Sequence, residues 1–116
     1  MTQDGERVVQ AVADARAESQ RAYGNYAETA PRTPEGHIRD AAGIVSIQAD
    51  CTRKLKRILL EHDLAVPSRG LKLILRGMTP HEQAITGQEV GAGAAIEVLN
   101  RELGDLGKFH ILSRLD

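Results

Sequence analysis

Proline and glycine residues divide this chain into segments with helical periodicity, and this division is the strongest constraint on what it can fold into. The clearest break is the stretch 30–34, where Pro31 and Pro34 both disfavour a helical conformation of the residue before them. We find no run of alternating polar and apolar residues long enough to favour a sheet. We therefore expect an all-α protein, a small helical bundle.

Capping signals set the expected helix boundaries. Thr33 followed by Pro34 starts one helix, and a capping hydroxyl, a proline and a glutamate coincide at residues 79–82 to start another. Because short connections favour antiparallel neighbours, we expect two long antiparallel helices and a short connecting helix. The expected single domain, 1–116, comprises an N-terminal helix (1–30), a long helix (34–63), a short helix (68–76), a second long helix (80–107) and a tail (108–116).

The composition favours one aliphatic core. The 116 residues include no Trp, one Phe and two Tyr, so the core must consist of Leu, Ile, Val and Ala. No apolar run reaches the ~18 residues of a membrane span, and the acidic start is unlike the basic start of a signal peptide. The single cysteine, Cys51, excludes an internal disulfide framework. We expect a soluble, cytoplasmic protein with no membrane partner.

Positive charge is concentrated in the middle of the chain. Residues 51–76 hold seven of the 15 Lys and Arg residues and two acidic ones, although the net charge of the chain is −1. Such a cluster can contact phosphates or another anionic partner, or it can be a solvated face paired with the protein's own acidic ends. The candidate residues for an anionic partner or a nucleic acid are Arg53, Lys54, Lys56, Arg57, Ser68, Arg69, Lys72 and Arg76.

Residues 55–76 resemble a helix-turn-helix motif. They combine an apolar helix, a short turn with apolar residues, and a second helix that Ser68 can cap. In such a motif the first residues of the second helix meet the major groove, so Ser68, Arg69 and Lys72 would read DNA. A helical hairpin with no role in DNA binding fits the same residues.

The second long helix carries three glycines within residues 87–93. Each interior glycine costs a helix about 1 kcal/mol relative to alanine, so we expect a compensating contact. Gly87, Gly91 and Ala95 follow one another at steps of four on one helix face, which lets another helix approach closely. We expect this face to serve helix packing, within the chain or in a homo-oligomer.

The titratable residues form no catalytic set. Of the four histidines, His62 and His81 would be brought together by the antiparallel helices, and they are weak candidates for a metal site. The serines lack the context of a nucleophile elbow, and Cys51 is typical of a small buried hydrophobic residue. We therefore expect no catalytic activity, no cofactor and no metal.

The sequence leaves more than one class of function open. The favoured class is a non-enzymatic helical interaction or regulatory protein, homo-oligomeric, that binds another macromolecule, preferably a protein, through its basic central patch. One alternative is a helix-turn-helix protein that reads DNA with residues 68–76, and another is a helical metal-binding protein. The salt dependence of binding tests the DNA alternative. For each phosphate that the protein neutralises, the logarithm of its affinity for duplex DNA falls by about 0.9 when the logarithm of the salt concentration rises by one.

Overall fold

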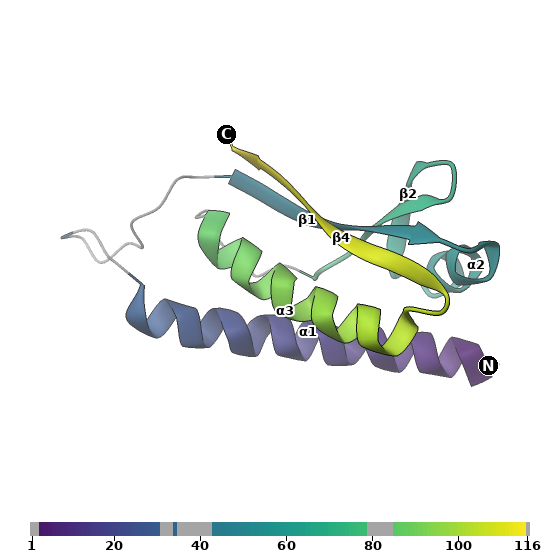
Figure 1. Ribbon diagram of the computed structural model, residues 1–116, viewed down its shortest axis with the longest axis horizontal. Helices are drawn as coiled ribbons and strands as arrows, with labels where there is room; N and C mark the ends of the chain where they lie inside the picture. The colour runs from purple at the N-terminus through teal and green to yellow at the C-terminus, as the bar shows by residue number, and fades with distance from the viewer. Residues whose placement is uncertain (1–2, 31–33, 35–42, 79–84, 116) are drawn as a thin grey trace.

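The computed structural model describes residues 3–30, 34, 43–78 and 85–115, with side chains up to residue 113, and it has an α+β fold (Figure 1). The expected all-α helical bundle is therefore wrong. The elements are, in chain order, α1 (Gln3–Thr29), β1 (Gly43–Cys51), α2 (Arg53–Glu61), β2 (Ala65–Arg69), β3 (Lys72–Leu75), α3 (Ile85–Leu103) and β4 (Gly107–Leu115).

The four strands form one antiparallel sheet in the order β2-β3-β1-β4. The central strand β1 pairs with β4 along its whole length and with β3 near its end. The connectivity β1-α2-β2-β3-α3-β4 is the split β-α-β arrangement of ferredoxin-like domains, here preceded by α1. This topology brings the end of β1, the starts of β3 and β4, and α2 to one end of the sheet.

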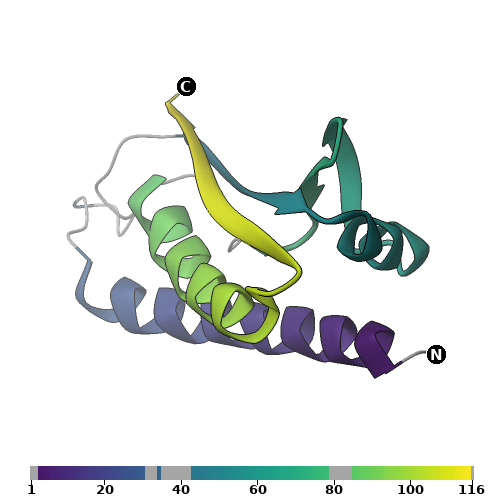
Figure 2. The same ribbon diagram turned by 45° about the vertical axis from the view of Figure 1, so that its right-hand side comes forward.

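The helices cover one face of the sheet and leave the other face open. Figures 1 and 2 show α3 between the sheet and α1, with α1 extending along the bottom of the molecule. α1 and α3 run antiparallel, because Arg7 near the start of α1 bonds Asp105 beyond the end of α3. Further along α1, the Ser19 hydroxyl donates to the Met78 carbonyl oxygen at 2.8 Å. α1 covers residues 3–29 of the N-terminal helix predicted for residues 1–30. The predicted antiparallel pairing of a helix 34–63 with the second long helix is wrong, because α3 runs antiparallel to α1.

The long helix predicted for residues 34–63 is wrong over most of its described part. Residues 43–51 form β1, in which Val45, Ile47 and Ala49 are buried and the residues between them are more exposed. β-branched side chains favour a strand when one face packs on a core, as this one does. Helix begins only after Thr52, whose hydroxyl accepts from the backbone N–H of Leu55 at 3.2 Å.

The short helix predicted for residues 68–76 is also wrong, and with it the helix-turn-helix. β2 and β3 form a hairpin whose turn contains Gly70 with a φ of 59°, a conformation that suits glycine. Leu73 and Leu75 are buried and alternate with the less buried Ile74, which is the pattern of a strand. An isolated helix of nine residues is marginal in water, so sheet pairing overrides it here.

The C-terminal part of the prediction needs two corrections. Of the helix predicted for residues 80–107, residues 85–103 are helical, and the helix ends before the predicted residue 107; residues 80–84 lie outside the described residues. The predicted tail, 108–116, is largely the strand β4. β4 begins at Gly107, where a Cβ atom would lie 2.7 Å from the Asp50 carbonyl oxygen. The caps predicted at residues 33 and 79–82 lie outside the described residues.

The core is aliphatic, as predicted. The largest fully buried side chains are Ile47, Leu55, Leu59, Leu73, Leu99, Leu103, Val8, Val12 and Ser19. Phe109 of β4 is also buried in this core. Among the described residues, no helix combines the length and the apolar character that a membrane crossing requires.

Two side-chain amides fasten α3 to the sheet. The buried Gln88 accepts from the Val45 N–H at 3.0 Å and donates to the Gly43 carbonyl oxygen at 2.7 Å. Asn100 accepts from the Phe109 N–H at 3.1 Å and donates to the Phe109 carbonyl oxygen at 3.2 Å. Each amide supplies the two hydrogen bonds that a neighbouring strand would supply. Gln88 therefore satisfies backbone groups of β1 where β3 no longer pairs with it. Asn100 satisfies backbone groups in the first part of the outer edge of β4.

Candidate functional site

The basic residues predicted from the sequence come from α2 and from the β2–β3 hairpin. Lys56 Nζ of α2 donates to the Gly70 carbonyl oxygen at 2.7 Å, and the Cys51 N–H donates to the Leu71 carbonyl oxygen at 3.2 Å. These bonds hold the hairpin turn against the start of α2, at one end of the sheet (Figure 2). We name this end the basic surface and define it by Arg53, Lys56, Arg57, Arg69 and Lys72.

Only part of the positive charge in this region is neutralised by the protein itself. The paired cations and their carboxylates are Lys54 with Asp4, Lys72 with Asp50, and Arg76 with Asp63. Among the described residues, no carboxylate oxygen lies within 4.0 Å of Arg53, Arg57 or Arg69. These three guanidinium groups are exposed and available to an anionic ligand. Pairing with the protein's own carboxylates thus accounts for the cations named above, but it does not account for these three arginines.

Exposed leucines accompany the unpaired arginines. Leu60 of α2 is 37% exposed, and it shares a helix face with Arg53 and Arg57, which precede it by seven and three residues. Leu71 of the hairpin turn is 43% exposed. The basic surface therefore combines guanidinium groups with apolar side chains.

The sequence interpretation missed a polar group on the open face of the sheet. His110 Nε2 lies 2.7 Å from Gln48 Oε1, and His110 Nδ1 lies 3.7 Å from Asp50 Oδ2. Gln48 also donates to the hydroxyl of Ser68 at 3.5 Å, so Ser68 belongs to this polar group. Ser68 lies in β2 and not in a DNA-recognition helix. The alternation within residues 43–51 is the signal that could have placed Gln48 and Asp50 on one face.

Cys51 lies at the end of β1 as a buried free thiol. Burial, together with the neighbouring Asp50 carboxylate, raises the pKa of the Cys51 thiol to about 11, against a smaller opposing effect of Lys56. The thiol is therefore protonated at neutral pH and is a poor nucleophile. Its interpretation as a small buried hydrophobic residue is confirmed.

The described residues give the weak metal candidates no support. His62 caps the C-terminus of α2, and His81 lies outside the described residues. No three His, Cys, Asp or Glu side chains among the described residues are placed to hold a metal ion.

The small-residue face of α3 lies inside the chain. Gly87, Gly91 and Ala95 are all buried in the single chain. The face therefore serves packing within the molecule and is not exposed to a second copy.

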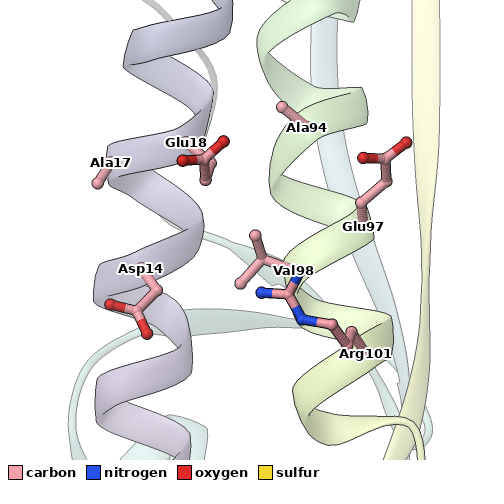
Figure 3. Close-up of a pocket in the computed structure, with 7 residues that line it drawn as sticks. All are labelled: Asp14, Ala17, Glu18, Ala94, Glu97, Val98 and Arg101. Atoms are coloured by element: carbon pink, nitrogen blue, oxygen red, sulfur yellow. The ribbon is translucent and has the colours of Figure 1, made fainter.

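A groove of about 450 Å³ lies between α1 and α3, lined by Asp14, Ala17, Glu18, Ala94, Glu97, Val98 and Arg101 (Figure 3). Val98 and Arg101 point from α3 towards α1, whereas the Glu97 carboxylate points away from α1. The Arg21 guanidinium donates a hydrogen bond to the Glu18 carboxylate at 2.7 Å, and this bond lowers the pKa of the Glu18 carboxyl. The charged side chains that line the groove are thus largely acidic, and one of them, Glu18, is already paired with Arg21 of the same helix.

The fold itself does not specify a function, because ferredoxin-like domains carry many different ones. Comparisons of the chain with protein-family models, with curated proteins and with solved structures gave no match. The surfaces of the molecule are therefore the basis for assigning its function.

Proposed function

We propose that this protein is a non-catalytic interaction module that binds an acidic segment of another protein through the basic surface. The observation that carries the proposal is the hydrogen bond from Lys56 to the Gly70 carbonyl oxygen, which joins α2 to the hairpin. It fixes α2, which carries the unpaired Arg53 and Arg57, beside the hairpin that carries the unpaired Arg69. Guanidinium groups form strong, bidentate hydrogen bonds with carboxylates, so an acidic segment is the matching ligand.

The exposed leucines favour a protein over a nucleic acid. Arginine beside apolar side chains is typical of protein interfaces, whereas phosphate binding relies on charge. Sheets that bind single strands stack bases on aromatic rings, but the Phe109 ring is buried in the core. The helix-turn-helix geometry that supported DNA reading is replaced by a hairpin.

The same proposal places the interaction in the cytoplasm. Its support is the free thiol of Cys51, which fits a reducing compartment. No metal or cofactor enters the proposed interaction.

Fluorescence polarisation with a labelled peptide rich in Glu and Leu, and with a labelled duplex of about 20 base pairs, tests the proposal at about 50 and 200 mM salt. We expect the peptide to bind more tightly than the duplex and to weaken with salt. The double variant R57A/R69A should lose about tenfold in peptide affinity, which corresponds to ~1.4 kcal/mol.

The matched control is R21A/R101A, which removes two arginines that are paired with neighbouring glutamates on α1 and α3. It should leave peptide affinity unchanged. The proposal is overturned if the peptide fails to bind at low salt, if the control loses as much affinity, or if the duplex binds more tightly than the peptide.

A further inference from the structure

Part of the outer edge of β4 has no hydrogen-bonding partner among the described residues. Asn100 bonds the N–H and C=O of Phe109 on the side of β4 away from β1. Because backbone groups alternate in direction along an antiparallel strand, Ile111 and Ser113 turn their N–H and C=O to the same outer side. No hydrogen bond within the described residues engages these four groups.

The position of α3 explains why protection stops at Phe109. Near its end α3 reaches the outer edge of β4 through Asn100, whereas near its start Gln88 bonds β1, the next strand inward. Asn100, near the end of α3, reaches the sheet edge with its amide. One turn earlier α3 carries Ile96, which packs against the core as Ile111 does and offers no polar group. The edge beyond Phe109 is therefore a template for strand addition.

Within residues 109–113, which Lys108 and Arg114 flank, the side chains carry none of the features that prevent strand addition. Residues 109–113 contain no Lys, Arg, Asp, Glu or Pro. Leu112 is 41% exposed on the open face, and Ile44 on the adjacent strand β1 is 51% exposed. Addition of a strand beside β4 would cover the Leu112 side chain as well as satisfy backbone groups, whereas Ile44 lies on the inner strand and would stay outside the contact.

We propose that β4 pairs antiparallel with β4 of a second copy of this chain, around a two-fold axis at Leu112. With the axis there, Ile111 lies opposite Ser113 of the second copy, and Ser113 lies opposite its Ile111. All four outward groups of each strand are then bonded, and Asn100 stays on Phe109. The two Leu112 side chains face each other about 4.5–5.5 Å apart between their Cβ atoms.

A second copy fits this edge because the strand is complementary to itself. The residue on the axis is apolar, and no charged side chain within residues 109–113 opposes its own copy. The pairing joins two four-stranded sheets into one of eight strands. It leaves the basic surface free, because the β2–β3 hairpin lies at the opposite edge of the sheet from β4. The dimer would therefore present two basic surfaces.

Sedimentation equilibrium on the full chain tests this pairing. We expect a monomer–dimer equilibrium with a dissociation constant of about 10–500 µM. Ser113→Pro removes an outward N–H, and Leu112→Lys places two like charges at the axis. Both variants should raise the dissociation constant at least about tenfold.

The matched control is Ile44→Lys, which places the same charge on the same open face but on the inner strand β1. Circular dichroism melting confirms that each variant folds. The Ile44 variant should dimerise like the wild type. The proposal is overturned if the wild type stays monomeric up to about 1 mM. It is also overturned if the Ile44 variant dissociates as much as the Leu112 variant, because the contact would then use the sheet face.

Discussion

The two edges of the sheet are protected to different extents. β2 is five residues long, contains Pro67 and has a register irregularity between Pro67 and Arg69, and these features hinder strand addition. β4 is nine residues long, and within the described residues its protection is the bond pair between Asn100 and Phe109. The comparison suggests a division of roles, in which the β2 edge offers charged side chains and the β4 edge offers backbone groups.

Removing the buried amide of α3 gives the largest expected effect. Gln88 is 6% exposed, and Gln88→Leu leaves the Val45 N–H and the Gly43 carbonyl oxygen unsatisfied in the interior. Each buried orphan group costs about 1–3 kcal/mol, so the free energy of unfolding should fall by about 2–6 kcal/mol in urea denaturation. A loss below about 1 kcal/mol would show that water replaces the amide.

Removing the second amide sharpens the comparison between a closed and an open edge. Asn100→Ala frees the Phe109 N–H and C=O at the outer edge of β4, where water can reach them. The free energy of unfolding should fall by only about 1 kcal/mol. The dimer should become up to about fivefold tighter, since the pairing can lengthen by one residue pair at each of its two ends. Weaker dimerisation in sedimentation equilibrium would mean that Asn100 supports the edge and does not limit it.

The hairpin turn tests the β2 side of the comparison. Gly70 has a φ of 59°, and nothing lies within 4 Å of the position of a Cβ atom there. Gly70→Ala should therefore lower the free energy of unfolding by about 1 kcal/mol through backbone strain alone. Gly24→Ala, within helix α1 at a position where nothing lies within 4 Å of a Cβ atom, should raise it by up to about 1 kcal/mol. Thermal melting of both variants checks the opposite signs.

The smallest expected effect concerns an ion pair that lies outside the sheet, between α1 and the end of α3. The hydrogen bond from Arg7 lowers the pKa of the Asp105 carboxyl below its ordinary value of 3.8. A lowered folded-state pKa stabilises the fold above pH 3.8, and this contribution disappears as the pH falls through the lowered value. Arg7→Gln should therefore melt slightly below the wild type at neutral pH, and the difference should vanish at about pH 2. A difference that persists in acid would assign the effect to packing of the Arg7 side chain.

Local patterns predicted the N-terminal helix but not the sheet, and β1 shows why. Val45 and Ala49 are four residues apart, a spacing that fits both one face of a helix and one face of a strand. The choice is made by partners distant in sequence, since Gln48 pairs with His110 on β4. No short window of sequence contains that pairing.

The candidate site was predictable in its residues but not in its assembly. The basic residues of α2 and the hairpin stand out by charge, but the contact between these two elements, made by the bond from Lys56 to Gly70, is not visible in the sequence. The polar group around His110 was missed because it spans strands that the helical interpretation did not contain. Alternation within residues 43–51 would have indicated the two members of this group on β1, Gln48 and Asp50.

Amide hydrogen exchange at two protein concentrations tests the difference between the two edges most directly. If β4 pairs with a second copy, the amides of Ile111 and Ser113 should exchange more slowly at about 1 mM than at about 10 µM protein. The amides of β2 should exchange at the same rate at both concentrations. Fast exchange of Ile111 and Ser113 at both concentrations, or a concentration dependence in β2, would contradict the proposed division of roles.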